Sequence, residues 1–252
     1  MRLTVVGCSG SFPGPDSPAS CYLVEAEHSG RTYRLLLDLG NGALGALQRY
    51  AALDSIDVVV LSHLHPDHCL DLCSFYVVRK YVPGGPMGPI PVYGPKGSDA
   101  RIARAYAVSS PANLADQFDF REFPAEPFAL GPLSVSVVRV DHPVRAYAIR
   151  VAEGDSSLVY SGDTAICGQI EQIADGADVL LAEASFLESE PNPYHLHMTG
   201  KDAASVAHRA GVGRLVLTHI PPWHSPDEVL ADASPHFSGP TMLATQGLQL
   251  TI

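Results

Sequence analysis

The chain has 252 residues, of which 46% are hydrophobic and 17% are charged, and its formal net charge at pH 7 is −11. This length and apolar content suffice for one sizeable core, so we expect a single domain over residues 1–252. Only three basic residues are lysines, and the acidic balance repels polyanions, which argues against a broad nucleic-acid-binding surface.

Short apolar runs predict four strands in the first part of the chain, at residues 2–6, 21–26, 33–39 and 57–61. Helical patterns occupy residues 42–52 and 68–81. The Pro/Gly-rich stretch 82–97 predicts a loop around one short strand, and a helix follows near 98–108.

Strand signals return in the second half, at residues 133–140, 146–152, 157–162, 178–184 and 214–219 and in the final LQLTI. Helices are predicted at 200–210 and after Pro226. This rhythm of strands followed by helices, met twice, predicts an α/β protein with two sheets packed face to face and helices outside.

Cysteine usage and the N-terminus favour a cytoplasmic protein. The five cysteines are scattered and form no C-x-x-C pair, which is typical of a reducing compartment. The opening MRLTVVG lacks the apolar core of a secretory signal, and no apolar run approaches the length of a membrane span. We therefore expect no membrane partner.

The stretch LSHLHPDHCLDL, residues 61–72, places three histidines and an aspartate within six positions after an apolar strand. His63 and His65 project to the same side if the chain is extended there. Asp67 and His68 follow Pro66, where the chain must turn, so they can face a second point nearby. Imidazole and carboxylate ligands without cysteine indicate an open site for zinc, manganese or iron, and the pattern predicts two ions.

HLHPDH is an instance of the HxHxDH signature, and through it the chain is identified as a member of the metallo-β-lactamase superfamily. Later motifs of that family follow in order: His142 in VDHPVRAYAIRV, Asp163 in SGDTAIC and His219 in LVLTHIPP. The resemblance implies a four-layered αββα sandwich, a homodimer and two divalent ions, Zn²⁺ or Mn²⁺, between which the ligand set does not choose. It implies one ion on His63, His65 and His142, the other on Asp67, His68 and His219, and Asp163 between them.

Further motifs resemble ribonuclease Z and its short relatives. SGDTAIC is similar to their SGDTxxC, and LLAEASF is similar to their HEATF, with Glu183 kept and Ala182 in place of the histidine. HMTGKDAASVA is similar to their HST segment, which makes His197 the counterpart of the histidine that serves the leaving group. The resemblance thus implies three catalytic residues: His197, Glu183 to orient it, and Asp67 to contact the nucleophile.

One departure from ribonuclease Z concerns its Gly/Pro-rich arm, which grips tRNA and lies between the third-motif histidine and the bridging aspartate. Only residues 143–162 separate His142 from Asp163 here, which leaves no room for the arm. The expected function is therefore a two-metal phosphodiesterase for a small phosphodiester such as 3′,5′-cyclic AMP. Class II cyclic-nucleotide phosphodiesterases carry HxHLDH, from which Pro66 departs.

Three alternatives stay open from the sequence: a ribonuclease Z-like tRNA 3′-processing endonuclease, a lactone or thioester hydrolase, and a metal-binding protein without catalysis. The SGDT motif and the Glu183–His197 pair favour phosphodiester chemistry. Arg145 and the loop 8–16 are candidates for substrate contact, whereas His195 has no motif partner and is expected on the surface. The sequence does not name the base of the substrate.

Overall fold

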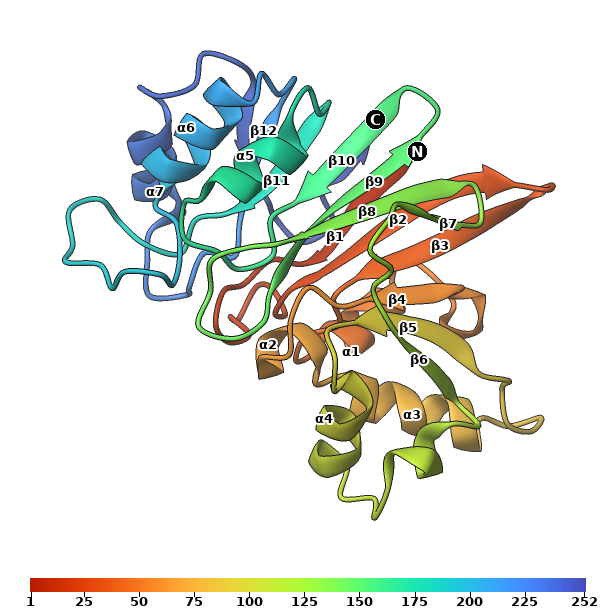
Figure 1. Ribbon diagram of the computed structural model, residues 1–252. Coiled ribbons are helices and arrows are strands. Elements are labelled where there is room, and N and C mark those ends of the chain that lie inside the picture. Colours follow the sequence, from red (N-terminus) through yellow and green to blue (C-terminus); the bar gives the residue numbers. More distant parts are fainter.

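Two seven-stranded sheets face each other in the computed structural model, which describes residues 1–252 (Figure 1). The first sheet has the order β14-β1-β2-β3-β4-β5-β6, and its strands are β1 (Arg2–Gly7), β2 (Cys21–His28), β3 (Arg31–Leu37), β4 (Val58–Val60), β5 (Ile90–Gly94), β6 (Phe118–Glu122) and β14 (Gln249–Thr251). The second has the order β13-β12-β11-β10-β9-β8-β7, and its strands are β7 (Phe128–Leu130), β8 (Leu133–Arg139), β9 (Tyr147–Glu153), β10 (Ser156–Tyr160), β11 (Val179–Glu183), β12 (Leu215–Thr218) and β13 (Thr241–Leu243).

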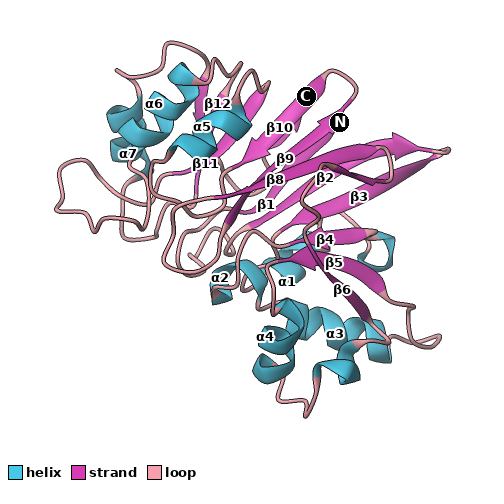
Figure 2. Cartoon of the chain, in the orientation of Figure 1, coloured by secondary structure: helices cyan, strands magenta, loops and turns pink.

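Helices lie on the outer sides of the two sheets (Figures 1 and 2). Those beside the first sheet are α1 (Ala43–Leu47), α2 (Pro66–Cys69), α3 (Leu72–Tyr81) and α4 (Ser98–Ala105), with the 3₁₀ turns η1 (Leu53–Ser55) and η2 (Pro111–Leu114). Those beside the second are α5 (Gly168–Ala174), α6 (Gly200–Arg209) and α7 (Pro226–Ala233). None of the helices has the length and apolar character needed to cross a membrane.

Alternating side chains of the strands build the layers. On β3, Leu35 and Leu37 belong to the apolar cluster between the sheets, whereas Leu36 belongs to the cluster under α1 and α3. On β11, Leu181 faces the layer between the sheets and Leu180 the layer under α6. This period of two is what a strand buried on both faces requires. The predicted four-layered αββα sandwich is confirmed.

The direction of the strands gathers their ends. Strands β3 to β6 run parallel, and so do β10 to β13, whereas β1–β3 and β7–β10 pair antiparallel. In parallel sheets the loops that follow the carboxyl ends meet at one edge, which is where such folds bind ligands. The segments after β4, β10, β11 and β12 carry histidines or acidic residues at this edge.

Two predicted helices differ from those observed. The predicted helix 42–52 ends at Leu47, because the chain tightens there into a turn in which Tyr50 N donates to Leu47 O at 2.8 Å. The predicted helix 68–81 is two helices, α2 and α3. Leu39 N donates to His68 O at 2.8 Å and Asp71 N donates to Leu39 O at 3.1 Å, so the loop after β3 takes hydrogen bonds that a continuous helix would make internally.

Besides the two 3₁₀ turns, four elements lie outside the sequence prediction. Three are short strands, β6, β7 and β13, and one is the two-turn helix α5. β6 is an edge strand of the first sheet whose outer residues, Arg121 and Glu122, are exposed. A polar edge strand lacks the continuous apolar run by which a buried strand is recognised.

Truncating Leu181 tests the layer between the sheets. Its side chain is fully buried there, so Leu181→Ala leaves a cavity and should lower the free energy of unfolding by about 2–5 kcal/mol, measured by urea denaturation. Val77→Ala, on the exposed side of α3, should stay within about 0.5 kcal/mol of the parent protein. Equal stability of the two variants would contradict the observed layering.

Candidate metal centre

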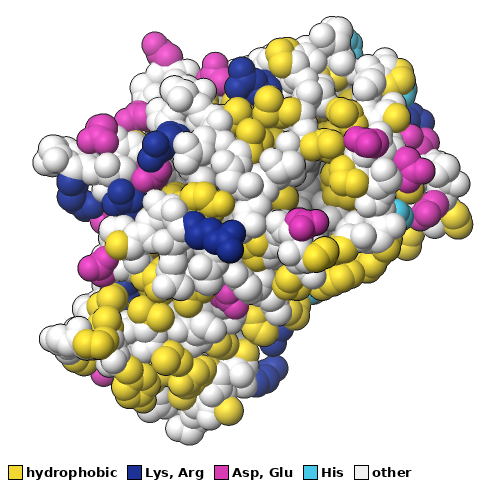
Figure 3. All heavy atoms as spheres, turned by 180° about the vertical axis from the view of Figure 1, so that it is seen from behind, with side chains coloured by type: hydrophobic (Ala, Val, Ile, Leu, Met, Phe, Trp, Pro, Cys, Tyr) yellow, Lys and Arg dark blue, Asp and Glu magenta, His cyan; other side chains and the backbone are white.

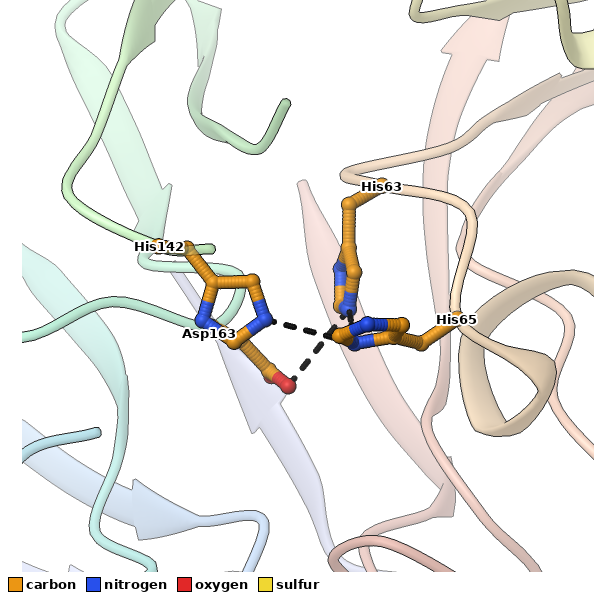
Figure 4. Close-up of side chains that lie close together, drawn as sticks. All are labelled: His63, His65, His142 and Asp163. Atoms are coloured by element: carbon orange, nitrogen blue, oxygen red, sulfur yellow. Dashed lines mark hydrogen bonds and ion pairs between the residues drawn. The ribbon is translucent and has the colours of Figure 1, made fainter. Parts of the chain in front are cut away.

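Four side chains from three separate loops converge at the edge where the strand ends meet (Figure 4). His63 and His65 follow β4, His142 follows β8, and Asp163 follows β10. His65 Nδ1 lies 3.0 Å from His63 Nε2 and 3.3 Å from His142 Nε2, and His63 Nε2 lies 3.5 Å from Asp163 Oδ2. We call these four residues the first ligand group.

A second ligand group, Asp67, His68, Asp163 and His219, shares only Asp163 with the first. His68 Nε2 lies 3.1 Å from His219 Nε2 and 3.4 Å from Asp67 Oδ2. Asp163 turns its other oxygen, Oδ1, towards this group, at 3.2 Å from His68 Nε2 and 3.5 Å from His219 Nε2. One carboxylate therefore faces both groups, with one oxygen for each.

The spacing of these atoms fits metal coordination. Two nitrogens that bind the same tetrahedral ion at about 2.0–2.1 Å stand about 3.3 Å apart. The neighbouring pairs given above lie 3.0 to 3.5 Å apart, and all the ligand atoms of a group lie within 4.8 Å of one another. Asp163 Oδ1 is buried and makes no hydrogen bond, a position that normally costs free energy. A cation among these donors would satisfy that oxygen.

Asp38, directly after β3, holds two of the histidines from behind. Its Oδ2 accepts from His68 Nδ1 at 2.7 Å and from the hydroxyls of Ser62 and Tyr160 at 2.7 and 2.8 Å. Ser62 Oγ lies in turn 3.1 Å from His63 Nδ1. With Nδ1 of His63 and His68 engaged in this way, their Nε2 atoms point into the ligand groups, and outer hydrogen bonds of this kind orient histidines in metal sites.

The remaining Nε2 ligands are oriented in the same manner. His142 Nδ1 donates to the carbonyl of Leu196 at 2.9 Å. His219 Nδ1 lies 2.8 Å from Ser185 Oγ, which donates to Glu183 Oε2 at 3.0 Å. The four imidazoles that present Nε2 to the ligand groups thus each have Nδ1 fixed by a hydrogen bond, a tautomer assignment that isolated surface histidines do not need.

Charges in the centre depend strongly on one another. Burial alone would raise the pKa of the Asp163 carboxyl, but His219, His68 and His63 hold it well below its usual range. Burial would lower the pKa of His68, yet Asp163 and Asp38 raise it well above its ordinary value. Burial and the neighbouring His68 lower the pKa of His63. These shifts favour the ionised form of Asp163 and the neutral form of His63, which are the forms that bind metal ions.

Backbone conformations around the centre are unusual. Asp38 and His219 both have φ near +57 to +59°, a left-handed conformation that L-residues rarely adopt. Gly162, just before Asp163, has φ +57°, and a Cβ there would lie 2.8 Å from Tyr147 O and 3.0 Å from Ser62 Cβ. Such conformations cost free energy and persist where the surroundings fix them, commonly at functional sites.

Glu183 and His197 form a pair beside the second ligand group. Glu183 is fully buried, and its Oε1 accepts from His197 Nδ1 at 2.8 Å and from Thr164 N at 2.7 Å. The ligand atoms of Glu183, His197 and His219 lie within 4.8 Å of one another. Burial would lower the pKa of His197, but Glu183 raises it to about 9. His197 is therefore protonated at neutral pH, with Nε2–H turned away from Glu183.

All the predicted site residues thus lie together, and their roles as ligands and catalysts stay a prediction. The loop 8–16 reaches the centre, where Ser11 N lies 3.4 Å from His219 Nε2, whereas Arg145 is exposed. His195 is on the surface as expected, but it has a partner, because its Nδ1 lies 2.6 Å from Asp141 Oδ2. The sequence analysis missed the supporting residues Asp38, Ser62, Tyr160 and Ser185. Only Asp38, a lone carboxylate after three buried leucines, carried a signal.

Comparison with known proteins places these motifs in a family context. The family model described as β-lactamase superfamily domain matches residues 33–220. The chain is 46% identical to an uncharacterized protein of Mycobacterium tuberculosis, over 95% of this chain and 88% of that protein. It is 28% identical to a ribonuclease Z of Myxococcus xanthus, over 100% of this chain and 98% of the relative.

A solved structure is also similar. The chain is 29% identical to YhfI of Bacillus subtilis, a probable metallo-hydrolase, over 98% of both proteins. The crystal structure of YhfI, described as a metallo-β-lactamase fold protein, superimposes with a TM-score of 0.87 over 99% of both chains. Sequence and structure thus give the same relationship.

Metal content tests the two ligand groups separately. We expect the purified protein, saturated with Mn²⁺ or Zn²⁺ and desalted, to retain two ions per chain by elemental analysis. His142→Ala removes a ligand of the first group only and His219→Ala one of the second only, so each variant should retain close to one ion. Loss of both ions from either variant, or one ion in the parent protein, would contradict two separable sites.

Removing the support behind His68 should weaken metal binding without removing a ligand. Asp38→Asn keeps the size of the side chain but loses its charge, and we expect metal affinity to fall about 10–100-fold in a competition assay with a chelating dye. Asp99→Asn, on α4, is the matched control and should leave affinity unchanged. Equal affinities of all three proteins would exclude the orienting role of Asp38.

Proposed function

Because this chain belongs to the β-lactamase superfamily and is a metallo-hydrolase related to ribonuclease Z, we propose that it is a two-metal phosphodiesterase acting on a small phosphodiester. The substrate we propose is a 3′,5′-cyclic nucleotide such as cyclic AMP, opened to the nucleoside monophosphate. The proposed cofactors are two divalent ions, Zn²⁺ or Mn²⁺, on the two ligand groups.

The Glu183–His197 pair is the observation that carries this proposal. A phosphodiester loses an alkoxide, which is a poor leaving group unless it is protonated as the bond breaks. His197 is mostly buried, with 12% of its side chain exposed, and its pKa of about 9 keeps a proton ready for transfer. Glu183 fixes the ring so that Nε2, and not Nδ1, presents the proton.

Different residues of the chain serve different steps of the proposed reaction. When bound, the two ions supply Lewis-acid activation of water and neutralise charge on the phosphate. Asp163 holds the two ligand groups at a fixed separation through its two oxygens. Asp67 contributes Oδ2 to the second group and is the residue we assign to contact the attacking water. His197 then delivers its proton to the departing ribose oxygen.

Two features favour a small substrate over tRNA. Residues 143–162, between His142 and Asp163, hold only β9, β10 and their connections, and the alignment with the Myxococcus ribonuclease Z spans 306 positions, so that relative carries insertions. The face in Figure 3 shows Lys and Arg side chains in small separate groups rather than a continuous basic stripe. Polyanion binding depends on such a stripe.

A tRNA 3′-processing endonuclease is the second candidate, and the similarity to ribonuclease Z favours it. A lactone or thioester hydrolase is less well supported: the SGDT motif is similar to that of ribonuclease Z, and a thioester loses a thiolate, which leaves without the acid that His197 provides. The three candidates differ in which bond they break, so a panel of substrates separates them.

A substrate panel tests the proposal. The Mn²⁺-loaded and Zn²⁺-loaded proteins are offered cyclic AMP, a 3′-extended precursor tRNA and an acyl lactone, and products are separated by chromatography. We expect turnover of cyclic AMP and little of the other two. Cleavage of the tRNA alone would establish the endonuclease, and cleavage of the lactone alone would establish the ester hydrolase.

His197→Ala tests the leaving-group role. We expect kcat for cyclic AMP to fall about 10²–10⁴-fold, since that is the usual contribution of a general acid. With bis(p-nitrophenyl) phosphate, whose leaving group departs without a proton, the loss should be much smaller, and metal content should not change. The control is His208→Ala, at an exposed position of α6. An equal loss with both substrates would refute the assignment.

A further inference from the structure

Exposed apolar side chains gather around the metal centre. Seven large hydrophobic residues are exposed in the chain, and two of them, Val77 and Tyr81, lie on the remote helix α3. The other five lie close in the sequence to residues of the centre. Four of them are within four positions of His142, Asp163, His197 or His219, namely Val144, Ile166, Tyr194 and Trp223. The fifth, Phe12, follows Ser11, whose backbone N lies 3.4 Å from His219 Nε2. Trp223 lines a cavity beside His197 and packs against Phe12, so the mouth of the centre is aromatic on this side.

A cavity of about 300 Å³ opens beside His197 at this mouth. Ser185, Phe186 and His197 line it towards the metal centre, and Glu190, Asn192 and Trp223 line its outer part. This volume is at the lower end of the range for small-molecule sites. The Phe186 ring stands nearly perpendicular to the His197 ring, with centroids 5.2 Å apart, so the cavity begins at the proposed proton donor.

Trp223 is held in place while most of it stays open. Its ring lies 5.1 Å from that of Phe12, at an angle of 34°. Even so, 63% of Trp223 is exposed, which is unusual for the largest apolar side chain. A supported aromatic surface beside a cavity is the arrangement on which nucleobases stack.

The outer part of the cavity, away from His197, does not suit a phosphate. No lysine or arginine lines it, and Glu190 contributes a carboxylate that is half exposed, with His224 Nε2 3.9 Å from its Oε2. Asn192 directs its amide nitrogen away, to Leu187 O at 2.8 Å. An uncharged group with donor N–H atoms suits these acceptors, whereas a second phosphate would be repelled.

The orientation of the substrate in the proposed reaction places its base on the side of the centre where this cavity opens. With the phosphate between the two ligand groups and His197 at the leaving oxygen, the ribose attached to that oxygen must extend past His197. From these observations we infer that the cavity is the nucleobase subsite and that Trp223 is its stacking residue. This inference rests on the proposed function and adds where the base is recognised.

Fluorescence tests the subsite directly, because Trp223 is the single tryptophan of the chain. The metal-loaded protein is titrated with AMP and, as the base-free match, with ribose 5-phosphate. We expect saturable quenching by AMP and little by ribose 5-phosphate. Equal quenching by both, or none by AMP, would overturn the subsite whatever the protein turns over.

Kinetics supply the second readout. Trp223→Ala should raise KM for cyclic AMP about tenfold or more with kcat nearly unchanged, because stacking contributes to substrate binding rather than to bond breaking. Trp223→Phe should recover much of the loss. Tyr81→Ala is the matched control, since Tyr81 is also aromatic and 64% exposed but lies on α3.

The outcomes separate the two claims. Turnover of cyclic AMP with an unchanged KM in Trp223→Ala would refute the subsite and leave the proposed function standing. Base-dependent quenching without turnover of any cyclic nucleotide would refute the proposed function and keep a nucleobase site. If Trp223→Ala lowered kcat by the same factor for cyclic AMP and for the base-free ribose 3′,5′-cyclic phosphate, the substitution would have damaged the centre in general. That result would also overturn the subsite.

Discussion

Buried Asp163 sets the constraint on which the centre depends. Each of its two oxygens faces one of the two ligand groups. Within each group, neighbouring ligand atoms lie 3.0 to 3.5 Å apart. Buried polar groups lower the stability of the folded protein unless each has a hydrogen-bonding or charged partner. Hydrogen bonds satisfy the far nitrogens of His63, His68, His142 and His219 but not Asp163 Oδ1. A divalent cation in each ligand group would be the partner of the Asp163 oxygen that faces it, and the spacing of the ligand atoms fits such cations.

The fold keeps these atoms together through the ends of its strands. The two half-parallel sheets bring the loops after β4, β10 and β12 to one edge, and each loop carries a different part of the centre. Asp38 then ties the loop after β4 to β3 and to Tyr160 of β10, so it links both sheets through one carboxylate. Glu183 has the corresponding role in the second sheet, where its carboxylate accepts hydrogen bonds from Thr164, Ser185 and His197.

The sequence could predict the ligands but not their support. His63, His65, Asp67 and His68 lie together in one motif, whereas His142, Asp163 and His219 follow separate apolar strands and were recognised only through their resemblance to the later motifs of the family. Asp38 and Tyr160 lie 122 positions apart and meet only through folding. The break between α2 and α3 is likewise tertiary, because backbone bonds from Leu39 replace those of a longer helix. The order of strands and helices along the chain was sufficient to predict two sheets with helices outside, and the family resemblance implied the four layers.

Anomalous X-ray scattering from crystals grown with Mn²⁺ tests the centre most directly. Two peaks about 3.5–4 Å apart are expected, one among His63, His65 and His142 and the other among Asp67, His68 and His219, each next to one oxygen of Asp163. A single peak, or peaks away from Asp163, would contradict the two-metal centre and with it the proposed reaction.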